Sequence, residues 1–259
     1  MSVMFHHAIV RKPGRNFSDG LTSGRLGVPS YEKALDQHLR YCQALELCGL
    51  RVTVLKADLR YPDATFVEDT AVLTPNSAIL TLPGARSREG EVAEIHEHLG
   101  RFFRAFHQIC APGTLDGGDV CQAENHFFIG ISGRTNQEGG QQLAELLARE
   151  GHTSSFVDIR GMNNVLHLKS GLAYMGDNHL VVSEELSRHV HFCGYSLVCV
   201  NAAESYAASC LRVNDRVLVP AGFPGLRDSI ERLGYAVLPL EMSEFEKMDG
   251  GLSCLSLRF

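Results

Sequence analysis

The sequence has no tryptophan and no apolar run near the ~20 residues that a membrane-spanning helix needs. The N-terminal segment Met1–Arg11 contains an apolar stretch that is too short and too interrupted for a signal peptide. We therefore expect no membrane partner and a cytoplasmic location.

Dense runs of lysine and arginine interleaved with aromatic residues are also missing, and the formal net charge is −6. Nucleic-acid-binding proteins usually carry such basic clusters, so we expect no nucleic-acid partner and favour a small cationic substrate. The composition, 44% hydrophobic and 21% charged, is that of an ordinary globular protein. No Pro- or Ser-rich linker divides it, so we expect a single domain over residues 1–259.

The eight cysteines include no Cys-x-x-Cys pair. In a reducing compartment, cysteines scattered through apolar segments are usually buried free thiols. We expect this of seven of them, namely Cys42, Cys48, Cys110, Cys121, Cys193, Cys199 and Cys210. The eighth, Cys254, stands apart because it ends the segment Asp249–Cys254, which contains a Gly-Gly pair close to the C-terminus.

Four segments share a pattern of apolar run, polar turn and second apolar run, which predicts a β-hairpin in each. The segments begin at Phe66, Leu115, Val165 and Tyr206 and turn at Pro75–Ser77, Glu124–Asn125, Gly176–Asn178 and Asn214–Asp215. Helical patterns at Gly90–Arg104, Gln137–Glu150 and Gly225–Leu233, and short strands such as Arg51–Leu55 and Ala236–Leu240, lie between them. The predicted unit is hairpin, helix, strand.

Gly251–Phe259 supplies only half a hairpin, while Met4–Arg11 is an orphan strand at the other end of the chain. Pairing them closes a ring of five units that recur about every 40 to 50 residues, a spacing typical of propellers. We therefore predict an α/β fold, a five-bladed α/β propeller. The ring also predicts that the opening strands carry Glu68, Asp69, Asp116, His167 and Cys254 toward a common central cavity.

A cysteine, a histidine and several carboxylates suggest attack of a thiolate on a cationic, planar carbon such as that of a guanidinium. A neighbouring imidazolium or a cationic substrate lowers the pKa of a thiol from ~8.5 toward neutrality, which we expect for Cys254. His167 is placed to donate a proton to a departing amine and then to activate water, with Asp116 fixing its tautomer. Asp63, Glu68 and Asp69 are candidates to bind the cation through charge-assisted hydrogen bonds.

Taken singly, each of these residues has a plainer explanation. A lone cysteine or histidine in an apolar strand is usually part of the core, and Glu68-Asp69 is also compatible with a solvated strand end. Their recurrence at equivalent positions of the repeat favours function. So do adjacent acids within apolar strands, because a buried charge without a partner costs several kcal/mol.

Six motifs, in this order along nearly the whole chain, resemble those of the dimethylarginine dimethylaminohydrolase family. They are Pro62-Asp63, Phe66–Asp69, Leu115–Asp119, Gly133–Asn136, Leu166–Ser170 and Asp249–Cys254. The family belongs to the guanidino-group-modifying enzymes, whose fold is a five-bladed α/β propeller, the pentein fold. The resemblance therefore implies the fold that the repeats predict.

The resemblance further implies a hydrolase acting on linear amidines. Cys254 would attack the guanidinium carbon of an Nω-methylated arginine and expel dimethylamine or methylamine, and water would release citrulline from the covalent thiouronium. No metal or organic cofactor is implied. The resemblance assigns substrate contacts to Leu21, Asp63, Glu68, Asp69, Arg88, Arg134, Met248 and Asp249, with the two arginines on the α-carboxylate.

Several different functions stay open. Arginine and agmatine deiminases of the same superfamily carry an Asp two residues after the histidine, where this chain has Lys169. A ureido-directed hydrolase, a non-catalytic propeller that binds protein or RNA, and a cysteine protease are three further candidates, although no papain-like Cys-Trp neighbourhood exists. A zinc site at His6-His7 or His96–His98 lacks a ligand set.

The sequence does not show whether the protein forms a homodimer or whether it prefers mono- or dimethylated substrate. It also leaves open the role of Leu186–Glu204 and whether the small-residue loop Ser18–Gly24 closes over substrate as a lid.

Overall fold

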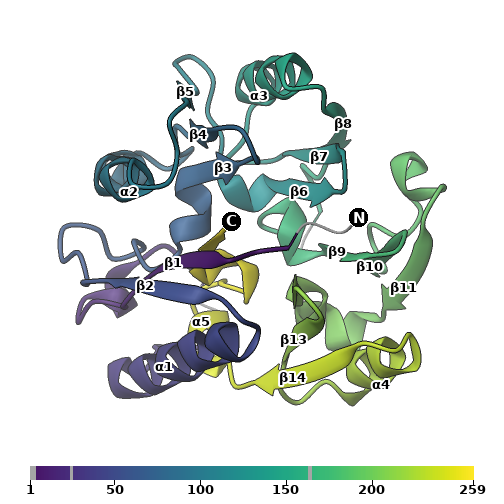
Figure 1. Ribbon diagram of the computed structural model, residues 1–259. Helices are drawn as coiled ribbons and strands as arrows, with labels where there is room; N and C mark the ends of the chain where they lie inside the picture. The colour runs from purple at the N-terminus through teal and green to yellow at the C-terminus, as the bar shows by residue number, and fades with distance from the viewer. Residues whose placement is uncertain (1–3, 24–25, 163–164) are drawn as a thin grey trace.

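The computed structural model describes residues 4–23, 26–162 and 165–259, arranged as five small sheets around a central axis (Figure 1). Every sheet has three strands, an antiparallel pair and a third strand parallel to the middle one. The sheets, each from the axis outward, are β15 (Leu257–Arg258), β1 (His7–Arg11), β2 (Arg51–Leu55); β3 (Ala71–Leu73), β4 (Ala78–Leu80), β5 (Phe106–Gln108); β6 (Val120–Ala123), β7 (His126–Ile131), β8 (Thr153–Asp158); β9 (Leu172–Gly176), β10 (His179–Ser183), β11 (Ser196–Val200); and β12 (Leu211–Val213), β13 (Arg216–Pro220), β14 (Ala236–Leu240).

The two ends of the chain close the ring as predicted. β15, the last strand, pairs antiparallel with β1, with Ala8 opposite Arg258 and Ile9 opposite Leu257. The four predicted hairpins also form, and three of their turns use residues with positive φ, including Glu124, Asn178 and Asn214. The predicted five-bladed α/β propeller is therefore confirmed.

Helices lie outside the sheets and connect the second strand of a unit to its parallel third strand, a connection that a tight turn cannot make (Figure 1). They are α1 (Tyr31–Leu47), α2 (Val92–Leu99), α3 (Gln137–Arg149) and α4 (Pro224–Arg232), with the short α5 (Ser243–Glu246) before the last turn. Gln137–Glu150 and Gly225–Leu233 are thus confirmed as helical, whereas the helix predicted from Gly90 to Arg104 is shorter. The fourth unit departs from the predicted pattern, because the 3-10 turn η6 (Val190–Phe192) stands there in place of an α-helix.

The candidate catalytic residues do not lie on the opening strands, and this expectation was wrong. They occupy or precede 3-10 turns that come before those strands: η2 (Val67–Thr70), η4 (Gly117–Asp119), η5 (Leu168–Ser170) and η8 (Ser253–Leu255). On a strand, neighbouring residues point to opposite faces, so Glu68 and Asp69 could not both approach the axis. The helical turns remove that restriction.

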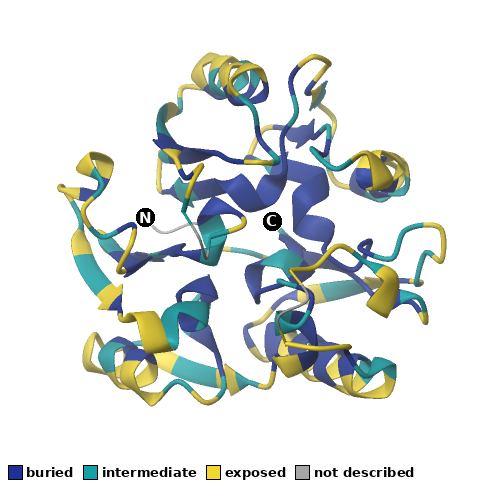
Figure 2. Ribbon diagram, turned by 180° about the vertical axis from the view of Figure 1, so that it is seen from behind, coloured by how far each residue is buried: buried dark blue, intermediate teal, exposed yellow. Residues whose placement is uncertain are grey.

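Burial is deepest around the axis, and the outer helices carry the exposed residues (Figure 2). Asp116 and Asp119 are fully buried at 0% exposure, so their charges depend on protein partners. The cysteine prediction is wrong for three residues, since Cys110, Cys193 and Cys199 are exposed. The other four predicted core cysteines are buried, and all eight are free thiols.

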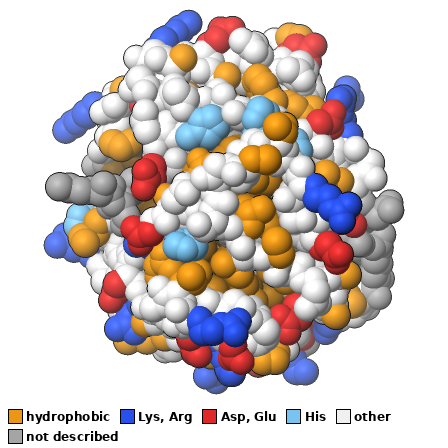
Figure 3. Space-filling model, turned by 90° about the vertical axis from the view of Figure 1, so that its right-hand side faces the viewer, with side chains coloured by type: hydrophobic (Ala, Val, Ile, Leu, Met, Phe, Trp, Pro, Cys, Tyr) orange, Lys and Arg blue, Asp and Glu red, His pale blue; other side chains and the backbone are white. Residues whose placement is uncertain are grey.

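The side of the molecule that carries the fourth unit shows hydrophobic and histidine side chains between scattered single charges (Figure 3). In the fourth unit Val190 is 71% exposed, and the rings of His189 and His191 lie 5.2 Å apart. Among the described residues, no helix is long and apolar enough to cross a membrane.

Candidate active site

His167 and Asp116 form a buried pair next to the axis. The imidazole Nε2 lies 3.0 Å from a carboxylate oxygen of Asp116, whose other oxygen accepts the backbone N–H of Gly84 at 2.8 Å. Burial lowers the pKa of His167, but the charges of Asp69 and Asp119 and the bond to Asp116 raise it to about 9. Burial raises the pKa of Asp116, and His167 outweighs this, so its pKa is lowered. At neutral pH the pair is an imidazolium and a carboxylate.

Cys254 lies in η8, half-buried, with its sulfur accepting the backbone N–H of Gly251 at 3.4 Å. In the unliganded chain this thiol is not acidified, so of the two predicted causes of a lower pKa the cationic substrate is the one that stays open. Burial, followed by the charges of Glu68 and Asp69, raises the pKa of Cys254 to about 12, against the smaller opposing effects of Gly251 and Lys169. The resting thiol is therefore protonated until something cationic offsets the two carboxylates.

Asp69 is fixed by a buried ion-pair network. One of its oxygens pairs with Arg88, and the other accepts the backbone N–H of Gly118 at 2.9 Å. Arg88, only 4% exposed, also binds both oxygens of Glu91 and the carbonyls of Asp63 and Phe66. Buried pairs of this kind hold their geometry because removing one partner leaves the other charge uncompensated.

Two glycines let the turns approach one another. A Cβ atom on Gly118 would stand 2.8 Å from a carboxylate oxygen of Asp69 and 2.9 Å from the ring of His167. A Cβ atom on Gly117 would collide with the carbonyl of Glu68 at 2.0 Å. The Gly-Gly pair is therefore required for packing η4 against η2 and η5.

Asp119 is a positioning residue whose role the sequence does not reveal. Its buried carboxylate accepts hydrogen bonds from Ser132 Oγ (2.6 Å), Thr135 Oγ1 (2.7 Å) and the backbone N–H of Leu168 (2.9 Å). It thus joins the turn after His167 to the loop that carries the half-buried Arg134. Ser132 and Thr135 belong to one short loop. The third donor, the N–H of Leu168, is 49 residues from Asp119 along the chain, and no spacing in the sequence predicts this contact.

Glu68 has cationic partners of its own. One carboxylate oxygen lies 2.7 Å from Lys169 Nζ and 3.1 Å from Arg258 Nη2, while the other is buried without a hydrogen-bond partner among the described residues. Neither Lys169 nor Arg258 was a predicted site residue. Ring closure brings Arg258, on the last strand, beside η2, whereas Lys169 reaches Glu68 from η5.

Leu21, Asp63, Met248 and Asp249 gather at the loop whose role as a lid the sequence leaves open. The N–H of Leu21 donates to both oxygens of Asp63 at 3.0 and 3.2 Å, and Ser23 donates to Asp249 through its hydroxyl at 2.8 Å. Met248 is buried beneath this loop. The described part of the loop therefore sits closed on the segment before Cys254, and Gly24 falls outside the described residues.

Asp69, Asp116 and His167 also form the one group of possible metal ligands found among the described residues, with ligand atoms within 4.8 Å of one another. Their atoms are already committed to Arg88, to Gly84 and to each other. An imidazolium cannot ligate a metal, because both of its ring nitrogens carry protons. We expect turnover to be unchanged by EDTA, measured as citrulline formation before and after dialysis against chelator. Inhibition reversed by a divalent metal would contradict this.

No protein-family model matches the chain, but whole proteins do. The dimethylarginine dimethylaminohydrolase of Pseudomonas aeruginosa is 46% identical to it over 257 residues, covering 99% of this chain and 100% of the relative. This chain belongs to the dimethylarginine dimethylaminohydrolase family. The motifs that suggested the family thus sit in a chain that matches it from end to end.

Two solved structures of this family superpose on the whole chain. A cysteine-to-serine variant of the Pseudomonas aeruginosa enzyme, complexed with citrulline, gives a TM-score of 0.96 at 45% identity, covering 99% of this chain and 100% of the other. An adduct of a histidine-to-glycine dimethylarginine dimethylaminohydrolase with S-methyl-L-thiocitrulline gives 0.95 at 46% identity with the same coverage. This chain therefore has the fold of the family, the ring of five sheets described above.

Proposed function

We propose that this chain hydrolyses Nω-methylated arginines to citrulline and dimethylamine or methylamine. The observation that carries the proposal is that Asp69 acts both on the protonated thiol of Cys254 and on the His167–Asp116 pair, in a chain that matches the family over its whole length. Binding of citrulline by a cysteine-to-serine variant of a relative supports the same product.

The substrate itself activates the nucleophile. The charges of Glu68 and Asp69 hold the pKa of Cys254 high, so a guanidinium bound against them offsets the charges that oppose thiolate formation. Asp69 presents an oriented carboxylate because Arg88 and Gly118 fix both of its oxygens. A planar cation held in this way faces its carbon toward the sulfur.

His167 supplies and then recovers the proton. The thiol first releases its proton to solvent as the guanidinium binds. The thiolate then bonds to the guanidinium carbon, and the imidazolium donates its proton to the methylated nitrogen, which leaves as the free amine. The neutral imidazole then takes a proton from the water that attacks the same carbon. As the carbon–sulfur bond breaks, the hydroxyl proton of this adduct passes to sulfur, which restores the thiol and the imidazolium and releases citrulline.

The amino-acid end of the substrate fits the lid side of the site. The charges of Arg88 and Arg134 both act on Asp63, so two cations and a carboxylate lie together there. This set suits an α-carboxylate and an α-ammonium, and we propose that Asp63 binds the ammonium and not the guanidinium that the sequence suggested for it. Arg88 Nη1 bonds to Asp69, and the proposal assigns the second N–H of this nitrogen to the α-carboxylate.

A product assay tests the function. The chain is incubated with dimethylarginine, arginine, agmatine and citrulline, and the released amine is identified by mass spectrometry. We expect dimethylamine and citrulline from dimethylarginine at a rate far above ammonia release from the other three. Ammonia from arginine or agmatine as the main product would replace the proposal by a deiminase.

The charge on Glu68 should control the reactivity of the resting thiol. Alkylation by iodoacetamide reports the thiolate fraction, so in the free wild type we expect its rate to keep rising with pH beyond the range of an ordinary thiol. Glu68→Gln removes one raising charge and leaves Lys169 and Arg258 unneutralised, which lowers the pKa of Cys254. Alkylation of this variant should be faster at the same pH.

Glu94→Gln is the matched control, because Glu94 pairs with Arg11 away from Cys254. Its alkylation profile should follow the wild type. Equal profiles for Glu68→Gln and the wild type would show that Glu68 does not govern the thiol.

Lys169 bears on substrate choice. Deiminases carry a carboxylate here, whereas Lys169 directs its ammonium to Glu68. Lys169→Asp should shift relative kcat/KM from dimethylarginine toward arginine by about 1–3 kcal/mol, the scale of one charged hydrogen bond. Competition kinetics with the two substrates measures the ratio.

Lys169→Asp both removes the ammonium and adds a carboxylate. Lys169→Met separates these two changes, because it removes the ammonium without adding a carboxylate. An equal shift in both variants would assign the effect to the lost cation. An unchanged ratio in Lys169→Asp would remove this position from selectivity, and a wild type that prefers arginine would contradict the proposed function.

A further inference from the structure

One peptide group, the one that joins Gly250 to Gly251, connects Cys254 to a tyrosine. Its N–H donates to Cys254 Sγ at 3.4 Å, and its carbonyl oxygen accepts the hydroxyl of Tyr206 at 2.8 Å. Because both atoms belong to the same amide plane, the two hydrogen bonds form a chain from the phenol to the sulfur. Tyr206 lies in the 3-10 segment η7 (Ala202–Ser209), 44 residues before Gly250, and has no part in the steps described above.

The two glycines let other turns pack closely against this peptide group. A Cβ atom on Gly250 would stand 2.2 Å from the ring of Phe66, and one on Gly251 would stand 2.6 Å from Cβ of Ser209. Glycine therefore fits at both ends of the peptide group, but glycine also restricts backbone rotation less than any other residue. The direction of the N–H consequently depends on the groups that hold this amide, and the hydroxyl of Tyr206 holds its carbonyl.

Tyr206 acts on this carbonyl as a donor. Burial, followed by the charge of Glu246, raises the pKa of its phenol well above the ordinary value, so the hydroxyl keeps its proton at neutral pH. A backbone carbonyl only accepts hydrogen bonds, which fixes the direction of this one. Ser209 Oγ donates to the carbonyl of Tyr206 at 2.8 Å, and Ser209 itself packs against Gly251.

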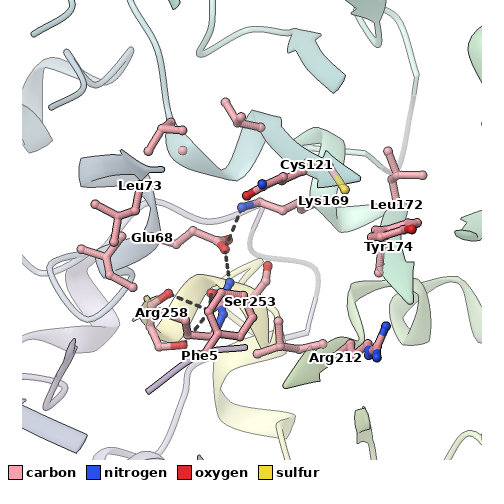
Figure 4. A pocket seen from close by; sticks show the side chains of 18 of the residues that line it. Phe5, Glu68, Leu73, Cys121, Lys169, Leu172, Tyr174, Arg212, Ser253 and Arg258 are labelled. Carbon is pink, nitrogen blue, oxygen red and sulfur yellow. Dashed lines mark hydrogen bonds and ion pairs between the residues drawn. The ribbon is translucent and has the colours of Figure 1, made fainter. Parts of the chain in front are cut away.

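An amide whose carbonyl accepts a hydrogen bond becomes a stronger N–H donor, because hydrogen bonds in a chain polarise one another. A stronger donor at sulfur favours the thiolate, which is the reacting form of cysteine. The charged groups that act on Cys254 come from other elements. The carboxylates of Glu68 and Asp69 oppose the thiolate, whereas Lys169, which pairs with Glu68 (Figure 4), favours it together with the uncharged N–H of Gly251.

We propose that Tyr206 is a positioning residue for the nucleophile, because its hydroxyl orients and polarises the peptide group whose N–H stabilises the Cys254 thiolate. The phenol keeps its own proton throughout, and the proton of the thiol leaves to solvent as the guanidinium binds. This inference rests on the proposed function and concerns only the activation of Cys254, which precedes attack on the guanidinium carbon.

Tyr206→Phe tests the inference, because it removes the hydroxyl and keeps the ring that packs against Phe223. In the free protein we expect alkylation of Cys254 by iodoacetamide, assigned by peptide mapping, to slow roughly three- to tenfold at a given pH, the scale of one neutral hydrogen bond. With dimethylarginine, kcat should fall by a similar factor while KM changes by less than about twofold. Thermal unfolding checks the fold.

Replacement of Tyr206 by 3-fluorotyrosine strengthens the hydrogen bond, because the fluorinated phenol is more acidic and a better donor. Alkylation of Cys254 should then be faster than in the wild type, a change that a purely structural role of the ring would not produce. Tyr235→Phe is the matched control, since the hydroxyl of Tyr235 bonds to Asp177 at 3.3 Å in a hairpin turn of the fourth unit. Its alkylation rate and kcat should equal those of the wild type.

Wild-type alkylation and kcat in a folded Tyr206→Phe variant would overturn the inference and leave the proposed function intact. Equal slowing of alkylation in Tyr235→Phe would also overturn it, because the effect would then not depend on the bond to Gly250. Absence of citrulline formation by the wild type would overturn the proposed function, whereas the alkylation rates still decide whether Tyr206 acts on the thiol.

Discussion

Cys254→Ser is expected to abolish citrulline formation while the fold is retained. A serine hydroxyl has a pKa far above that of a thiol, and His167 cannot act as its base because the imidazole is protonated at neutral pH. The thiol-to-hydroxyl change alters little volume in the half-buried turn η8. Turnover is measured as citrulline release, and the fold by circular dichroism and thermal unfolding.

Cys42→Ser is the matched control. Cys42 is a buried thiol in α1 whose pKa burial raises to about 11, yet it lies against His38 in the outer layer. This variant should keep its turnover. Substantial citrulline production by Cys254→Ser would assign the chemistry to another group.

His167→Ala should lower turnover by roughly 10² to 10⁴, the usual consequence of losing a general acid–base catalyst. The leaving amine then departs without a proton from the imidazolium, and the imidazole no longer takes one from water. Because Asp69, Asp119 and Asp116 raise the pKa of His167 to about 9, the wild-type rate of amine release should fall as pH rises through that region. The variant should lose this alkaline limb.

His126→Ala provides the comparison, because His126 lies on β7 at the ring's edge, where its ring bonds to Thr153. Its turnover and pH profile should match the wild type. Near-normal turnover in His167→Ala would mean that another group moves the proton.

The ring could be predicted because its signals are local. Turn residues such as Asn178 and Asn214 adopt positive φ, and alternating apolar runs on either side of them define hairpins. The helix α1 is less evident from the sequence because its buried stripe includes Gln37 and His38, so its periodicity is not purely apolar. The 3-10 turns resemble strand in the sequence because each is followed at once by an apolar strand.

The sequence predicts which residues form the site, but it does not predict the pKa of the thiol. Motif order identified Cys254, His167 and Asp116, and the fold brings their turns together. The direction of the pKa shift of Cys254 depends on whether burial and the charges of Glu68 and Asp69 outweigh the charge of Lys169. That comparison requires the three-dimensional structure. Asp119 and Arg258 act across the ring, and no spacing along the chain encodes such contacts.

The most direct test of the central claim is mass spectrometry of the protein after acid quenching during turnover of dimethylarginine. We expect an adduct on the peptide that contains Cys254, with the mass of the substrate after loss of dimethylamine, and none in Cys254→Ser. Steady citrulline formation with no adduct on Cys254 in His167→Ala, where the intermediate should persist longest, or an adduct on a different residue, would contradict it.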